Sequence, residues 1–216
     1  MVSLIDVTST TIRRWFHPLI DAFTVRNVPF HYRWRLLLLQ PVAILSYVIN
    51  TIPAVLSRCS SVIYIPVHNN HYIRSLIYYT TPKVEAGHPK LRPLHLDIHG
   101  GGFIAGHPEA DHRFCKEIAD RTGAVVVSTT YRFAPRHPFP AAINDIDDIV
   151  SWLLQNAKER FQADPNTFTI SGSSAGGNLA LATSIREGLK HKVKGVITFY
   201  APVSDPTQLQ YNGYVR

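Results

Sequence analysis

The chain has 216 residues and a formal net charge of +7, from 22 Lys and Arg against 15 Asp and Glu. Hydrophobic residues make up 45% and charged residues 17%, which excludes a disordered chain and fits a globular protein with one sizeable core. Two cysteines, Cys59 and Cys115, are too few for a disulfide framework and have no metal-ligand spacing, which suits a reducing compartment.

The N-terminal quarter, residues 1–58, contains a long apolar stretch. Residues 36–56 carry no charge over 21 positions, a length that matches a bilayer-spanning helix. Pro41 and Pro53 argue against a continuous helix, because each removes a backbone donor and disrupts the preceding turn. Two interpretations therefore stay open for this segment: an apolar helical cap packed over a pocket, or a membrane-associated segment that contacts lipid through residues 36–56.

The positive charge of this quarter is scattered. Residues 1–58 hold six Arg, no Lys and two Asp, with no basic stripe, so nucleic acid is not an expected partner. The apolar stretch starts late and lacks the small-residue cleavage site of a signal peptide. We therefore expect an intracellular protein, either cytoplasmic or membrane-associated.

The remainder, residues 59–216, has the pattern of a partial α/β domain. Runs rich in β-branched and aromatic residues on both sides of an Asn-Asn turn predict a β-hairpin, with strands at 61–66 and 72–79. After a polar loop, short apolar runs alternate with helical periodicity, which predicts a mostly parallel sheet with helices on both faces. The expected strands are 94–98, 124–131, 167–171 and 193–200, and the expected helices are 109–122, 141–160 and 175–189.

A serine motif lies between one of these strands and the next helix. Residues 172–176 read GSSAG and fit the pattern G-x-S-x-G, with Ser174 at the central position. The glycines allow a sharp strand-to-helix turn that projects the serine hydroxyl above the sheet. The N-terminus of the following helix offers unpaired N–H groups to a developing oxyanion, and Ala175 N–H is one candidate donor.

A glycine motif follows an earlier strand. It consists of His99, Gly100, Gly101 and Gly102, with Phe103 next. Successive glycines leave the backbone uncovered, so the N–H groups of Gly101 and Gly102 are predicted to complete an oxyanion hole with Ala175. Each motif alone is modest evidence, but the pair is much stronger, because the glycine motif precedes the serine motif and each lies at the end of a predicted strand.

Together the motifs resemble the hormone-sensitive-lipase-like branch of the α/β-hydrolases, the esterases with an HGGG motif. The resemblance runs from about residue 60 to 205 and includes YRFAPRHPFPAA at 131–142 and GSSAGGN at 172–178. It implies an α/β-hydrolase fold with an N-terminal helical cap. It also implies hydrolysis of small-molecule carboxylic esters through an acyl-enzyme on Ser174, without metal or cofactor.

The sequence offers no clear base or acid for Ser174. After it come only one histidine, His191, in a charged turn, and the two acids Glu187 and Asp205, none at the place that the family implies. The resemblance also stops at about the sixth strand. Three explanations stay open: a fragment of a complete esterase, a degenerate relative that binds a ligand or serves as an accessory protein, or a sheet completed by another chain. The oligomeric state, the substrate and the pathway, including secondary-metabolite tailoring, stay open as well.

Overall fold

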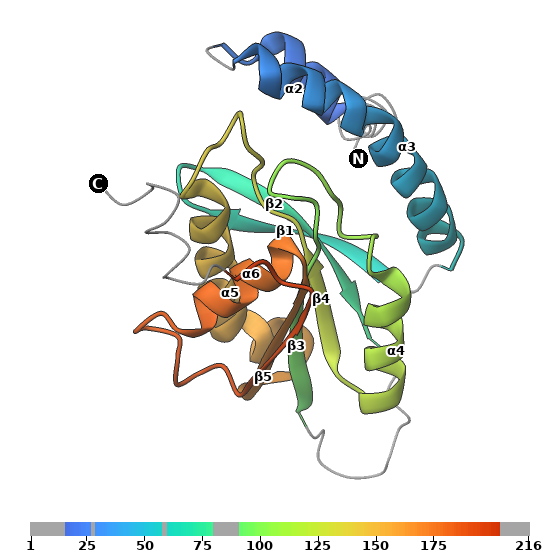
Figure 1. The fold of residues 1–216 in the computed structure, drawn as a ribbon. Helices are drawn as coiled ribbons and strands as arrows, with labels where there is room; N and C mark the ends of the chain where they lie inside the picture. The colour runs from blue at the N-terminus through green and yellow to red at the C-terminus, as the bar shows by residue number, and fades with distance from the viewer. Residues whose placement is uncertain (1–15, 27–28, 58–59, 80–90, 204–216) are drawn as a thin grey trace.

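The computed structural model describes residues 16–26, 29–57, 60–79 and 91–203, and Figure 1 shows the arrangement of their helices and strands. In these ranges the strands form one mixed sheet in the order β1-β2-β4-β3-β5-β6. The strands are β1 Ser60–Val67, β2 His71–Tyr78, β3 Arg92–Ile98, β4 Val125–Thr129, β5 Ala163–Ser173 and β6 Gly195–Phe199. The helices are α2 His17–Thr24, α3 Phe30–Ser57, α4 His112–Thr122, α5 Ala141–Phe161 and α6 Ala175–Ser184.

The first two strands confirm the predicted hairpin. β1 and β2 pair antiparallel from Ser60 opposite Tyr78 to Val67 opposite His71. Asn69 and Asn70 in the turn have φ of 61° and 57°, a left-handed conformation that asparagine tolerates better than most residues. This hairpin joins the remaining strands through an antiparallel pairing of β2 with β4.

Helices cover both faces of the sheet, as the alternation of strands and helices predicts. α4 packs on β4 and β2, whereas α5 and α6 pack on the opposite face (Figure 1). Side chains of β4 alternate accordingly: Val126 belongs to the core cluster under α4, and Val125 and Val127 belong to the larger cluster. The pairings of β4 with β3, β3 with β5 and β5 with β6 are all parallel.

Three element boundaries differ from the prediction by three residues or more. α4 begins at His112 rather than residue 109, because two tight backbone turns precede it, closed by Ala110 N–H to His107 O and His112 N–H to Glu109 O. α6 ends at Ser184 rather than residue 189, and the following residues form turns instead. β5 starts four residues early because its first residues pair with Arg92 and Pro93 of β3.

The expectation that prolines interrupt the N-terminal apolar stretch is wrong. α3 runs unbroken over Phe30–Ser57, through both Pro41 and Pro53. Contacts with α2 help to hold it: Arg33 donates to the carbonyls of Ala22 and Val25, and the buried Gln40 side chain accepts from Leu19 N–H. Tertiary contacts of this kind stabilise a helix that its local sequence disfavours. Within the described residues, no helix is long and apolar enough to span a bilayer.

A buried ion pair fixes the loop after β4 to α5. Arg132 donates from Nε and Nη2 to the carboxylate of Asp145 at 2.9 and 2.6 Å, and its backbone N–H donates to the same carboxylate at 2.9 Å. The Asp145 side chain is fully buried. Removing one partner of such a pair leaves an uncompensated buried charge.

We therefore expect Asp145→Ala to lower the free energy of unfolding by about 3 kcal/mol or more. Urea unfolding followed by circular dichroism measures this loss. Lys116→Ala is the matched control, since it breaks the exposed pair of Lys116 with Asp120, which should contribute less than about 1 kcal/mol. Equal effects of the two substitutions would contradict the structural role of the Arg132–Asp145 pair.

A polar network lies inside the sheet between β3 and β5. His95 contacts the hydroxyls of Thr169 and Ser171 at 2.8 and 2.9 Å, and Ser171 donates to Asp97 at 2.6 Å. Burial lowers the pKa of His95 to about 4, so its imidazole is neutral in the folded protein at neutral pH.

This depressed pKa predicts a loss of stability in acid. Between pH 6.5 and about 4 the unfolded chain binds a proton at His95 that the folded chain does not, so the free energy of unfolding falls as pH falls. Urea unfolding measures the free energy of unfolding at pH 7 and at pH 5. Its decrease between these two pH values should be about 2 kcal/mol larger for the native protein than for His95→Gln. The same pH dependence in both proteins would refute a neutral buried His95.

Candidate active site

The two sequence motifs meet at the carboxyl ends of β3 and β5. These strands run parallel side by side, and Ile98 at the end of β3 pairs with Gly172 near the end of β5. From β3 the chain crosses to β4 on one side and then returns to β5 on the other. Such a switch point opens a crevice above the strand ends, the usual ligand site of open α/β sheets.

Ser174 occupies a strained turn between β5 and α6. Its φ of 51° and ψ of −119° lie outside the regions that ordinary residues prefer. Gly176 permits this turn to approach β3, because a Cβ there would stand 2.0 Å from the Ile98 carbonyl oxygen. Hydrogen bonds from Ser174 N–H to Phe199 O and from Asn178 N–H to Ser174 O fix the turn on both sides.

The glycine motif forms a compact turn beside this serine. Gly101 has φ of 127°, and a Cβ there would stand 1.9 Å from the Ala105 carbonyl oxygen. Its own carbonyl accepts from the N–H groups of Ile104 and Ala105, each at 3.1 Å. In the described part of the chain, the N–H groups of Gly101, Gly102 and Ala175 donate to no backbone carbonyl. They are thus available as donors to a ligand.

The side chain of His99 supports the glycine turn through hydrogen bonds. Its Nδ1 donates to the carbonyl of Gly100 at 2.6 Å, and its Nε2 accepts from the hydroxyl of Thr130 at 2.8 Å. Burial lowers the pKa of His99 to about 4, which keeps the fully buried ring neutral. The ring also stacks on Tyr131. His99 is therefore held as a structural support and is not free to act as a base.

A cavity of about 450 Å³ lies over both motifs, and α3 supplies one wall of it. The glycine turn and Ser174 supply the facing side. The lining residues from α3 are Leu39, Val42, Ala43, Ser46 and Tyr47. The outline of this space therefore depends on where α3 sits.

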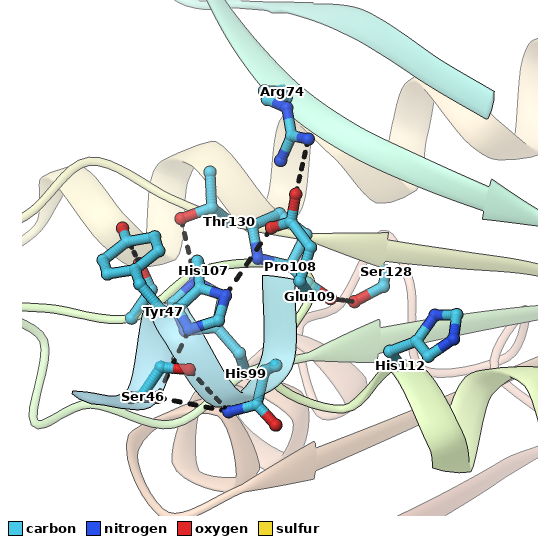
Figure 2. Close-up of polar contacts among 12 residues, drawn as sticks. Ser46, Tyr47, Arg74, His99, His107, Pro108, Glu109, His112, Ser128 and Thr130 are labelled. Carbon is cyan, nitrogen blue, oxygen red and sulfur yellow. Dashed lines mark hydrogen bonds and ion pairs between the residues drawn. The ribbon is translucent and has the colours of Figure 1, made fainter. Parts of the chain in front are cut away.

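A chain of polar contacts, absent from the sequence prediction, holds α3 in this position. Figure 2 shows His107 between Ser46 of α3 and Glu109, with Nε2 at 3.3 Å from the Ser46 hydroxyl and Nδ1 at 3.6 Å from the carboxylate. Tyr47 stacks on the His107 ring and donates its hydroxyl to the carbonyl of Gly106. The glycine turn and the helix above it are thereby connected.

Glu109 anchors that chain to the sheet. Arg74 of β2 donates to its carboxylate at 2.5 Å (Figure 2). Burial alone would raise the pKa of Glu109, but the neighbouring His107 and Arg74 lower it to about 2, so the carboxylate is ionised. The only feature of the sequence that could have indicated this role of Glu109 is its place a few residues after the glycine motif.

Asp111 is a further acid beside the cavity that the sequence prediction missed. It lines the same space as Ser174, and burial raises the pKa of its carboxyl group. It comes from the turn before α4, four residues after His107.

The structure brings no base to Ser174 within the described residues, where its hydroxyl has no hydrogen-bonding partner. α6 is ten residues long and leads away from the serine by about 15 Å, and His191 lies exposed in the turns beyond it. Glu187 is exposed in the same region, and Asp205 lies outside the described residues. Nor do three His, Cys, Asp or Glu side chains gather as metal ligands anywhere in the ranges that the structure describes.

Comparisons with known proteins agree with the fold and identify the family of this chain. A family model described as the alpha/beta hydrolase fold matches residues 95–214. Versiconal hemiacetal acetate esterase of Dothistroma septosporum is 38% identical over 109 residues, which cover 49% of this chain and 33% of that protein. Arylacetamide deacetylase of Oryctolagus cuniculus is 42% identical over 90 residues, which cover 40% of this chain and 23% of that protein.

Solved esterase structures match a larger part of the chain. The hyperthermophilic esterase of Pyrobaculum calidifontis superposes with a TM-score of 0.65 at 27% identity, covering 89% of this chain and 58% of its own. Bacterial heroin esterase superposes with a TM-score of 0.62 at 29% identity, and the match covers 76% of this chain and 53% of the heroin esterase chain. The chain thus spans little more than half the length of these structures, and it belongs to the hormone-sensitive-lipase-like branch of the alpha/beta hydrolase family.

Proposed function

We propose that the protein is a serine hydrolase of carboxylic esters that works through an acyl-enzyme on Ser174. The strained turn of Ser174 beside the unpaired N–H groups of the glycine turn carries this proposal. The serine oxygen attacks the ester carbonyl, and Gly101, Gly102 and Ala175 donate to the oxyanion that develops. The alcohol then leaves, and water releases the acid. No described side chain is assigned as the base that takes the serine proton.

The substrates in this proposal are small-molecule esters. Two relatives are named for acetyl groups, versiconal hemiacetal acetate esterase and arylacetamide deacetylase, so acetate esters are the first substrates to assay. The wall that α3 contributes is mostly apolar, which favours an apolar acyl or alcohol group beside the reacting carbonyl. Metabolic roles, including the tailoring of secondary metabolites, fit this chemistry.

Fluorophosphonate labelling tests whether Ser174 is activated. We expect one adduct on the peptide that contains Ser174, found by intact mass and peptide mapping, because the probe forms its bond only with an activated serine. Ser174→Ala should remove that adduct, whereas Ser173→Ala should retain it as the neighbouring control. A folded native chain that takes up no probe at position 174 would refute catalysis by this chain.

The glycine turn gives a second test. Gly101→Ala should slow labelling at Ser174 by about a hundredfold or more, because its Cβ would collide with the Ala105 carbonyl and displace the donors. Gly102→Ala is the matched control: its Cβ meets only the Ile104 side chain at 3.8 Å, although its φ of 62° still imposes strain. Equal labelling rates in the two variants would argue against an oxyanion hole formed by this turn.

A second candidate function is ligand binding without turnover. It is favoured by the Ser174 hydroxyl, which has no imidazole partner among the described residues. In that case the cavity would hold an intact ester or its acid, as a degenerate relative of a hydrolase would. Calorimetric binding of an acetate ester that is recovered unhydrolysed, in a chain that the fluorophosphonate does not label, would favour this alternative.

A further inference from the structure

Helix α3 is apolar on two opposite sides. Its inner side faces the domain, where Leu36 and Tyr47 are buried. Its outer side carries large apolar residues at spacings of four, three and four positions, which places them along one line of a helix. These are Leu38, Val42, Leu45 and Ile49, with exposed fractions of 65%, 63%, 60% and 59%. A helix that is apolar on both sides is ordinarily covered on both sides.

Aromatic residues extend this line toward the N-terminus of the helix. Phe30 and Trp34 continue the spacing of four, with exposed fractions of 81% and 43%. The guanidinium group of Arg35 lies over the rings of Tyr32 and Trp34, at 5.6 and 5.7 Å from their centres. Aromatic rings beside an arginine are typical of segments that lie at a membrane–water interface.

The charge of this region also fits one kind of partner. In the described parts of residues 16–57 the only acidic residue is Asp21, which is buried and paired with Arg136. The exposed charges include Arg26 and Arg35, both positive. Since α2 and α3 lie on the outside of the molecule, this basic and apolar surface is open to an anionic lipid surface (Figure 1).

We propose that α3 lies flat on an anionic lipid surface through an outer stripe, formed by Phe30, Trp34, Leu38, Val42, Leu45 and Ile49. Val42 belongs both to this stripe and to the cavity wall over Ser174, so the cavity reaches the lipid side of α3. This inference rests on the proposed function, and the substrates of the enzyme then include esters dissolved in the membrane. The other occupant of the stripe, a second copy of the chain, is separated from lipid by the experiment below.

Vesicle flotation with the whole chain tests the outer stripe. The probes are vesicles of phosphatidylcholine alone and of phosphatidylcholine mixed with phosphatidylserine. We expect the native chain to float with the mixed vesicles and Leu38→Glu/Leu45→Glu to bind them at least about tenfold more weakly, because it loses apolar contact and gains charges that anionic lipid repels. Ile185→Glu is the matched control, since Ile185 is a large exposed apolar residue outside α3, and it should bind like the native chain.

Each other result counts against the proposal. A native chain that floats with neither kind of vesicle overturns it, and so does equal binding by Leu38→Glu/Leu45→Glu. Sedimentation velocity of the same proteins is the second measurement. If the native chain is a dimer, the double variant is a monomer and neither binds vesicles, the stripe is assigned to a second copy of the chain. Ser174→Ala should float like the native chain, so failure of lipid binding and failure of catalysis are separate results.

Discussion

The approach of α6 to the end of β3 is the constraint on which the candidate site depends. At Gly176 the backbone of the helix comes so near the carbonyl of Ile98 that no side chain fits between them. Through this contact the serine turn after β5 lies against the glycine turn after β3, although more than seventy residues separate them in the sequence. The geometry around Ser174 therefore results from strand pairing and helix packing, and hydrogen bonds on both sides hold Ser174 in its strained conformation.

The sequence was most informative where a motif determines its own backbone. The hairpin, the alternation of strands with helices and the positions of both motifs follow from periodicity and from glycine, and the structure confirms them. Helix ends were less predictable, because the tight turns before His112 and after Ser184 depend on backbone hydrogen bonds that cannot be predicted from residue type. α3 shows the opposite failure: two prolines predicted a break, whereas the helix runs through both and contacts with α2 help to hold its first half.

The same limit applies to the polar contacts around the cavity. Ser46 and His107 are distant in sequence, and neither belongs to a recognisable motif, so their contact becomes visible only when α3 is placed over the glycine turn. Glu109 and Arg74 come from a turn and from β2, and a buried pair of this kind has no pattern along one strand or helix. What the sequence did indicate is the position of His99 and Arg132, each of which belongs to a segment that carries the family resemblance.

The position of β3 inside the sheet also has a consequence for the order of folding. β4 can pair with β2 and β3 as soon as it leaves the ribosome, but the other edge of β3 stays open until β5 has been made, on the far side of α5. The loop that the pairing of β3 with β5 closes is long, so it contributes to a high contact order and to slow formation of this strand pair. During synthesis the glycine turn is thus complete well before the serine turn that it faces. A nascent chain of this protein exposes one edge of the buried strand β3 for the whole time that α5 takes to emerge.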